Sequence, residues 1–197
     1  MGSNYNIRQF MAYKIRPLTA ALWPQLEDLF GSTGACGGCW CMYWRIGSAY
    51  QKNPREINKA SFHAVVRRGP PPGLLAFDGE LAVGWCQLTP RDQLPALERA
   101  RLLARIDEKP VWSISCFYVR RGYRNQGVTA ALISAALKAA RRAKATALEA
   151  YPVDSAETKS TTSIYTGKAS TFRRAGFRVV ARRVPHRPMM RHDLKQL

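Results

Sequence analysis

The junction at residues 119–129 combines a cation with a backbone suited to binding an anion. It reads VRRGYRNQGVT and places Arg124 and Gly127 between the apolar run VWSISCFYV and an alanine-rich run. The first N–H groups of a helix have no partners within the helix, and the helix dipole adds roughly half a positive charge there. Glycine lets a ligand approach the backbone closely. The junction therefore predicts a turn that binds a pyrophosphate at a helix N-terminus.

Other phosphate-binding motifs fit this chain poorly. The sequence contains neither G-x-x-x-x-G-K-[ST] nor G-x-G-x-x-G, which disfavours a P-loop nucleotidase and a dinucleotide-binding protein. An Arg-x-x-Gly motif alone is equally compatible with a surface loop that carries incidental arginines. Its position after a predicted buried strand and before a predicted helix favours the phosphate site.

A second cluster, CGGCWCMYWR at residues 36–45, concentrates thiols and aromatic rings. Cys36, Cys39 and Cys41 offer three zinc ligands, but no fourth ligand lies beside them, and the separated second pair of a zinc ribbon is missing. Cys36 and Cys39 also have the spacing of a redox pair, although no strand precedes them as in thioredoxin-like units. Simple packing of the loop on the core is a further alternative.

We interpret this cluster as the wall of a ligand pocket, because aromatic rings with polar edges provide flat, amphipathic surface. The residues of the predicted wall are Trp40, Tyr43 and Trp44. No metal is expected there.

Apolar periodicity and turn residues indicate the elements that must position these groups. Helices are predicted at 20–30, 54–68, 95–106, 128–143 and 167–175. Strands are predicted at 13–16, 74–78, 81–90, 111–119, 146–151, 177–184 and 188–194. The Asp-Gly turn after residue 77 predicts a hairpin, and residues 111–151 predict a parallel strand–helix–strand unit. The expected fold class is α/β, with a mixed sheet of six to seven strands and helices on both faces.

Composition and charge restrict the class of protein. Hydrophobic residues make up 46% of the chain, which argues against disorder. No apolar run approaches the ~18 residues of a membrane span, and no signal peptide is evident. The 31 Lys and Arg residues against 13 Asp and Glu residues give a net charge of +18, which favours an anionic partner such as nucleic acid, an anionic membrane or a phosphate-bearing cofactor.

The length and the cysteines suggest the organisation of the chain. Its 197 residues fit one domain at 11–197, preceded by an extension at 1–10, because MAYKIRPLT from Met11 resembles a protein start. The five cysteines are odd in number and three crowd into one loop, which fits a reducing compartment and hence the cytoplasm.

The stretch YVRRGYRNQGVTAALISAAL resembles the acetyl-CoA-binding motif of the GNAT superfamily of N-acetyltransferases, which reads V-x-P-x-x-[RQ]-x-x-G-x-[GA]. Val119, Arg124 and Gly127 fall on positions of this motif. Arg121 stands where the family often has proline, and Thr129 stands where it has glycine or alanine. The resemblance implies a GNAT-like fold with a splayed central sheet and acetyl-CoA as acyl donor.

The resemblance extends over the order of elements from about residue 12 to residue 194, and FRRAGFRVV at 172–180 resembles the family's closing helix and strand. It implies that backbone N–H groups of the turn hold the CoA pyrophosphate. It also implies that the end of the buried strand pairs with the pantetheine arm and polarises the acetyl carbonyl. The implied cofactor contacts are Phe117, Tyr118, Val119, Arg124, Asn125, Gln126, Gly127, Val128 and Thr129.

Many GNAT enzymes use a Glu as general base and a Tyr to protonate CoA. The strand at 111–119 has no carboxylate, so Glu149 on the next strand is the candidate base, with a salt bridge to a nearby arginine as the alternative. Phe172 stands where the family's Tyr would lie. Tyr165 is the candidate acid, and the alternatives are Ser170, Tyr151 and solvent.

The sequence thus predicts an enzyme, an acetyl-CoA-dependent N-acetyltransferase that acts by direct attack of a primary amine in a ternary complex. The Cys-Trp-Cys-Met loop resembles that of a GNAT subgroup, and the acceptor stays unassigned. A basic nucleic-acid-associated protein, including one that acetylates an RNA-bound amine, and a non-catalytic acyl-CoA sensor remain alternatives. A monomer or homodimer is expected, without a membrane partner.

Overall fold

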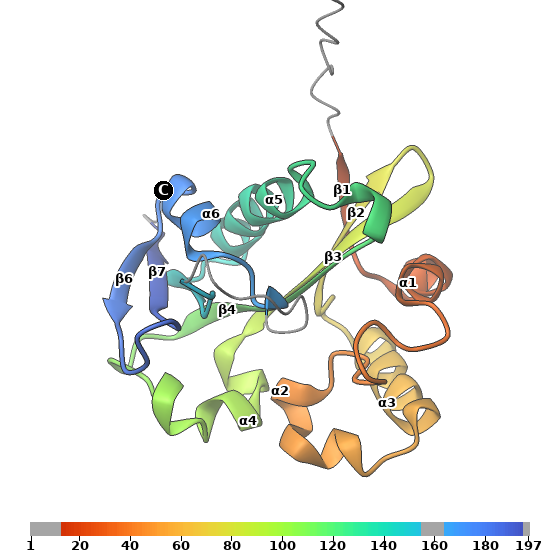
Figure 1. Cartoon of the computed structure of the whole chain (residues 1–197), viewed down its shortest axis with the longest axis horizontal. Coiled ribbons are helices and arrows are strands. Elements are labelled where there is room, and N and C mark those ends of the chain that lie inside the picture. Colours follow the sequence, from red (N-terminus) through yellow and green to blue (C-terminus); the bar gives the residue numbers. More distant parts are fainter. Residues whose placement is uncertain (1–12, 155–163, 195–197) are drawn as a thin grey trace, which may run out of the picture.

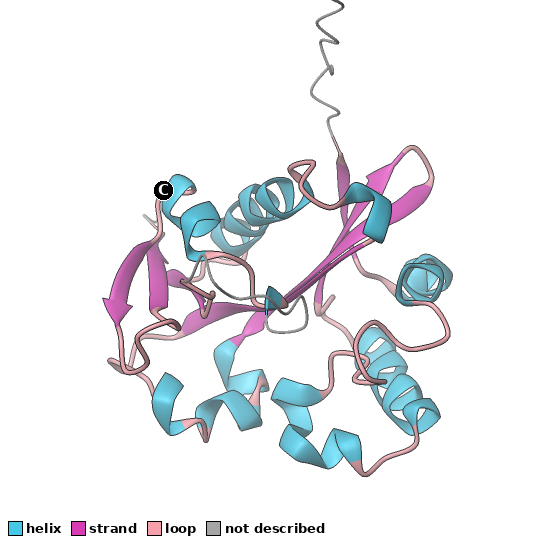
Figure 2. Cartoon of the chain, viewed as in Figure 1, coloured by secondary structure: helices cyan, strands magenta, loops and turns pink. Residues whose placement is uncertain are grey.

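The computed structural model describes residues 13–154 and 164–194. Its centre is a seven-stranded mixed sheet with the order β1-β2-β3-β4-β5-β7-β6, and helices cover both faces (Figure 2). The expected α/β class with a mixed sheet is confirmed. The expected extension at 1–10 and the start at Met11 lie outside the described residues, as does part of the polar loop after β5.

All the predicted strands are present, with ends that shift by a few residues. The prediction at 111–119 coincides with β4. The strands are β1 (Lys14–Pro17), β2 (Gly73–Asp78), β3 (Leu81–Pro90), β4 (Val111–Val119), β5 (Ala147–Ala150), β6 (Arg178–Ala181) and β7 (Met189–Asp193). The pair β4–β5 is parallel, as the strand–helix–strand unit predicts, and the other pairs are antiparallel.

The helices differ more from the prediction. They are α1 (Trp23–Phe30), α2 (Tyr43–Ile46), α3 (Arg55–Arg68), α4 (Pro95–Glu98), α5 (Val128–Arg142) and α6 (Ala169–Arg174). The predicted helix at 95–106 is wrong, because only α4 and a 3-10 turn at Arg101–Leu103 form there. Leu97 and Leu103 pack around Trp44, whereas Leu102 is 57% exposed, so the leucines do not share one helical face. The short helix α2 was not predicted.

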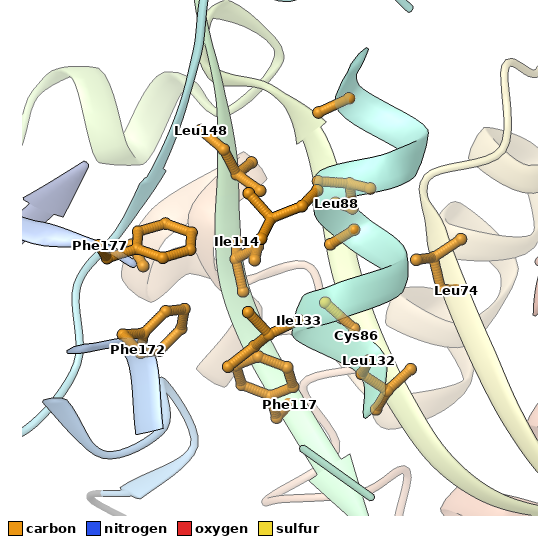
Figure 3. Close-up of a cluster of buried hydrophobic side chains, with 14 of the residues drawn as sticks. Leu74, Cys86, Leu88, Ile114, Phe117, Leu132, Ile133, Leu148, Phe172 and Phe177 are labelled. Atoms are coloured by element: carbon orange, nitrogen blue, oxygen red, sulfur yellow. The ribbon is translucent and has the colours of Figure 1, made fainter. Parts of the chain in front are cut away.

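The sheet lies between α5 and α6 on one face and α1 and α3 on the other (Figure 1), and each face carries its own hydrophobic cluster. On one face, Ile133 of α5 points toward Ile114 and Phe117 of β4, and Leu132 lies toward Cys86 of β3 (Figure 3). On the other face, α1 and α3 bury Phe30 and Phe62 against Trp85 of β3, with ring centroids 6.3 and 5.9 Å from that of Trp85. The helix that carries the predicted phosphate turn is thus held by the core itself.

The central strands part halfway along β4. Pairing with β5 covers only Val111–Ile114, and beyond it the register with β3 shifts so that Ser115 is an extra residue. Ile114 and Phe117 therefore both face α5, although they are three residues apart. The N–H of Phe117 donates to the carbonyl of Tyr165 at 2.6 Å instead of to β5. This divergence opens the sheet at the level of the predicted acetyl site.

Gly84 on β3 sets how closely the start of α5 approaches the sheet. A Cβ added there would lie 2.4 Å from Cγ1 of Val128 and 3.3 Å from Cδ1 of Leu132. The contact involves the first residue of α5, so any side chain at position 84 must displace the helix terminus or the strand.

We predict that Gly84→Ala lowers the free energy of unfolding by about 1–3 kcal/mol, because the added methyl group overpacks the contact. Val128→Ala in the same chain should recover much of this loss, which a double-mutant cycle in urea would detect as a coupling of at least ~0.5 kcal/mol. Val128→Ala alone is the control. Additive losses would show that Gly84 does not set the spacing.

Candidate functional site

A cleft of about 1030 Å³ lies beside the part of β4 that has left β5. Its walls come from the end of β4, the start of α5, the segment between α1 and α2, and residues 164–174. We call the part lined by α5, its preceding turn and α6 the donor half. The acceptor half is the part lined by Phe30, Ala35, Cys36, Cys39, Cys41, Tyr43, Trp44 and Tyr50.

The N-terminus of α5 faces the donor half with unpaired backbone donors. Gly127 is its N-cap, in the left-handed conformation with φ +85°, and no acidic residue or side-chain cap occupies the first turn. The first intrahelical bond runs from the N–H of Ala131 to the carbonyl of Gly127 at 3.0 Å. The N–H groups of Val128, Thr129 and Ala130 therefore precede the helical ladder, and these residues line the cleft.

Three cations line the same cleft as this terminus. The Nε of Arg124 donates to the carbonyl of Val119 at 3.3 Å, which places its guanidinium at the end of β4. Lys168 directly precedes α6 and Arg174 ends it. Both side chains are exposed and line the cleft. The sequence reasoning missed Lys168 and Arg174, although two basic residues within the predicted helix at 167–175 were a usable signal.

The predicted cofactor residues line the cleft, except Gln126. The side chain of Gln126 turns back and donates from Nε2 to the carbonyl of Gly122 at 2.7 Å. Phe117 requires a second correction, because its N–H is already bonded to Tyr165 and is not available to an acyl carbonyl. Alternation along the strand directs the N–H of Val119 to the same open edge.

Glu149 is not placed to act as a base. Its side chain is 1% exposed and does not line the cleft. Its carboxylate accepts from Nη1 of Arg91 at 2.9 Å, from Nη2 of Arg191 at 2.7 Å and from the hydroxyl of Tyr151 at 3.0 Å. The salt-bridge alternative is the one that the structure supports, since a carboxylate held between two buried cations has no access to a substrate.

Tyr165 lies in the cleft, unlike the alternative acid Tyr151, which is buried beside Glu149. Burial and the nearby Tyr43 raise the pKa of the Tyr165 phenol, so it stays protonated beyond the ordinary tyrosine range. Ser170 also lines the cleft and is exposed on α6. Phe172, at the position of the family's tyrosine, is fully buried and contributes only to the core.

The aromatic residues of the cysteine-rich segment have different roles. Tyr43 and Trp44 line the cleft, and Nε1 of Trp44 donates to the carbonyl of Ser115 at 3.1 Å. Trp40 does not line the cleft and is 3% exposed. Its ring centroid lies 5.8 Å from that of Trp23 and 5.4 Å from that of Phe30. The prediction that Trp40 contacts the acceptor is therefore wrong, because apolar burial holds this ring in the core.

The cysteines of this segment, Cys36, Cys39 and Cys41, line the acceptor half together with Cys116 of β4. All five cysteines are free thiols. Among residues 13–154 and 164–194, no group of three or more His, Cys, Asp or Glu side chains is arranged to hold a metal ion.

A buried polar chain between the halves was not predicted from the sequence. Gln87 on β3 is fully buried; its Oε1 accepts from the hydroxyl of Ser115 at 2.9 Å, and its Nε2 donates to the carbonyl of Cys41 at 3.2 Å. A glutamine inside the otherwise apolar strand LAVGWCQLTP was the available signal. It ties the cysteine-rich segment to the extra residue of β4.

The comparisons with known proteins identify the family. The model of the acetyltransferase (GNAT) family matches residues 39–161, more than half of the chain. The chain therefore belongs to the GNAT acetyltransferase family. A search of curated proteins finds no match.

Solved structures show the same fold. A protein of Corynebacterium glutamicum, described as histone acetyltransferase HPA2 and related acetyltransferase, is 20% identical with a TM-score of 0.55, covering 95% of this chain and 99% of its own. PaiA N-acetyltransferase of Thermoplasma acidophilum, in complex with coenzyme A, is 16% identical with a TM-score of 0.55, covering 93% and 99%. YncA of Salmonella typhimurium, with acetyl-CoA, is 15% identical with a TM-score of 0.56, covering 94% and 96%.

These similarities confirm the predicted GNAT-like fold and the assignment to a family of acetyltransferases. In the described part of the chain, no helix has both the length and the apolar character needed to cross a membrane.

The Glu149 contacts lead to a stability prediction. Glu149→Gln should lower the free energy of unfolding by about 3–5 kcal/mol, because it leaves two buried cations without their shared carboxylate. Asp28→Asn is the control; it removes an exposed partner of Arg120 and should cost at most ~1 kcal/mol. Urea unfolding measures both. An unchanged midpoint for Glu149→Gln would contradict a structural role and restore the catalytic hypothesis.

Proposed function

We propose that this chain transfers an acetyl group from acetyl-CoA to a primary amine by direct attack in a ternary complex. The observation that carries the proposal is the uncapped N-terminus of α5, which faces one end of a cleft whose other end is lined by aromatic rings. Membership of the GNAT family and the coenzyme A and acetyl-CoA complexes of similar folds support the donor.

The pyrophosphate of acetyl-CoA would be held by the free N–H groups of Val128, Thr129 and Ala130. Backbone donors and the helix dipole act together at such a terminus. Arg124, Lys168 and Arg174 line the same half of the cleft, so the remaining phosphate charge would also be neutralised. No acidic residue in the first turn of α5 opposes this binding.

The thioester would lie along the open edge of β4, between the donor half and the acceptor half. The N–H of Val119 points to this edge and would donate to pantetheine or to the acetyl carbonyl. Since the N–H of Phe117 already has a partner, oxyanion stabilisation there would rest on fewer backbone donors than the sequence resemblance implies.

Tyr165 would protonate the departing CoA thiolate. It is the cleft residue on the segment before α6 that carries a phenol, which is protonated at neutral pH. Burial raises its pKa and makes it a weaker acid than an ordinary tyrosine. The role is modest in energy, since a thiolate is a good leaving group with a pKa near 8.5. Solvent that enters from the exposed end of α6 would provide a slower route.

The organisation of the protein belongs to the same proposal. We infer a single catalytic domain at 11–197, a cytoplasmic location in which the five free thiols persist, and a monomer or homodimer. The Cys-Trp-Cys-Met loop would define a subgroup of the family by its contribution to the acceptor half.

A substitution at Gly127 tests the donor seat. Acetyl-CoA at about 100 times its dissociation constant should stabilise the protein by ~2.7 kcal/mol, and Gly127→Glu should abolish this gain by placing a carboxylate at the phosphate seat. Gly127→Ala imposes the same backbone strain at φ +85° without the charge and meets no atom within 4 Å, so it should retain most of the gain. Thermal unfolding with and without acetyl-CoA measures the difference. Equal stabilisation of both variants would exclude the seat.

Replacing the Tyr165 phenol tests the proton donor. Tyr165→Phe should lower kcat by about 10- to 100-fold, at the lower end of general-acid effects, and leave the stabilisation by acetyl-CoA intact. The donor acts when protonated and its pKa is raised, so the wild-type rate should not fall until the pH exceeds ~10. If the wild-type rate already falls below pH ~10, and this fall is absent in Tyr165→Phe, the pKa of Tyr165 is not raised. Acetyl-CoA binding without acetylation of any amine would instead favour the sensor.

A further inference from the structure

The acceptor half carries no negative charge among the residues that the structure describes. Its lining consists of aromatic rings, thiols and an alanine, and the rest of the cleft adds neither an Asp, a Glu nor a His within residues 13–154 and 164–194. An ammonium group removed from water needs a carboxylate, several free hydrogen-bond acceptors or the faces of aromatic rings. The composition of this wall is therefore informative about the charge of its ligand.

The backbone and amide acceptors that join this wall to β3 and β4 already hold hydrogen bonds within the protein. Oε1 of Gln87 accepts from Ser115, the carbonyl of Cys41 accepts from Gln87, and the carbonyl of Ser115 accepts from Trp44. Sγ of Cys39 accepts the N–H of Tyr43 at 3.3 Å. The tyrosine hydroxyls of the wall remain as acceptors, but hydroxyl groups carry no charge to neutralise an ammonium.

The thiols of Cys39 and Cys41 do not supply the missing charge at neutral pH. Burial raises the pKa of Cys39 to about 12. The hydrogen bond with Cys116, followed by burial, raises the pKa of Cys41 well above its ordinary value. The phenol of Tyr165 is also neutral, because burial raises its pKa. These groups therefore present neutral, polarisable surface.

The charges that do line the cleft are positive. Arg124, Lys168 and Arg174 lie in the donor half, and the whole chain carries a net charge of +18. With acetyl-CoA in place its phosphates would offset the three local cations, but they lie at the far end from the aromatic wall. A cationic acceptor would thus meet an unfavourable field on approach.

The rings of the acceptor half form a surface for a flat group. The centroids of Tyr43 and Trp44 lie 4.6 Å apart in an edge-to-face arrangement, and those of Tyr43 and Tyr50 lie 5.8 Å apart. The indole of Trp44 is held by its bond to Ser115, so this edge is positioned before a ligand binds. Such preorganised aromatic edges favour an aromatic ligand.

We infer that the acceptor is an aromatic amine or hydrazine that is uncharged at neutral pH and enters the cleft as the free base. The inference rests on the proposed acetyl transfer and specifies its substrate class. Because the lone pair of such a nitrogen is already free, attack on the thioester carbonyl needs no prior proton removal by the enzyme. The new N–C bond forms as the C–S bond breaks, the nitrogen loses its proton to water, and the thiolate takes one from Tyr165.

Two isosteric pairs of probes test the inference with the wild-type chain. Phenylhydrazine is neutral at pH 7 and benzylamine is protonated, so phenylhydrazine should have a kcat/KM at least about tenfold higher. For benzylamine, kcat/KM should rise about tenfold per pH unit between pH 7 and 9, since only its free base reacts.

The second pair consists of inhibitors. Benzamide should compete with phenylhydrazine at least tenfold better than its cationic isostere benzamidine. Mass spectrometry of the acetylated product avoids thiol reagents, which would react with the free cysteines.

A charge introduced into the wall provides the matched control. Cys36 is exposed and lines the acceptor half, so Cys36→Asp should strengthen inhibition by benzamidine at least fivefold, whereas Cys36→Asn should not. Glu157 lies outside the described residues, and Glu157→Gln should leave the preference for benzamide unchanged.

The outcomes separate this inference from the proposed function. Benzamidine binding as tightly as benzamide, or a flat benzylamine profile from pH 7 to 9, would overturn the neutral acceptor while acetyl transfer itself stands. Loss of benzamidine binding in Glu157→Gln would overturn it by identifying a carboxylate. Acetyl-CoA binding without acetylation of any amine would overturn the proposed transfer, and the inference with it.

Discussion

The buried carboxylate of Glu149 is the constraint on which the cleft depends. It joins Arg91, which follows β3, to Arg191 of β7, and Tyr151 links it to the hydroxyl of Ser113 on β4 at 2.9 Å. Buried ion pairs add little net stability compared with apolar packing, because desolvation offsets their attraction. Their effect is geometric: Arg91 pairs with Oε2 of Glu149 and Arg191 pairs with Oε1, so the three side chains hold one another in place. The network therefore fixes four strands at the level where β4 and β5 are still paired.

Above this level β4 is free to leave β5, and the extra residue Ser115 makes the departure abrupt. The carbonyl of Ser115 accepts a hydrogen bond from Nε1 of Trp44, and its hydroxyl donates to Oε1 of Gln87. The bulge therefore also positions the acceptor half. One irregularity in a strand thus produces the space, the open backbone edge and part of the wall. The other register shifts in the sheet, between β2 and β3 and between β6 and β7, lie away from this divergence of β4 and β5.

Sequence reasoning was reliable where function follows from consecutive residues. The turn from β4 into α5 is local: an apolar run, Arg124, Gly127 and an alanine-rich run specify a strand, a turn and a helix without reference to the rest of the fold. Glu149 and Trp40 were misassigned because their roles depend on partners far along the chain. Arg91 lies 58 residues from Glu149, and nothing in the local sequence predicts that pairing.

The cysteine-rich segment shows how misassignment of one residue can leave the role of its neighbours intact. Trp40 and Cys41 both adopt left-handed backbone conformations, with φ of +45° and +56°, which turn the chain sharply between the core and the cleft. Gly34 is required for this path, because a Cβ there would lie 2.2 Å from Nε1 of Trp40. Anchored by Trp40, the chain continues into α2 with Tyr43 and Trp44 directed at the cleft. The most conspicuous residue of the proposed acceptor loop is thus its anchor in the core.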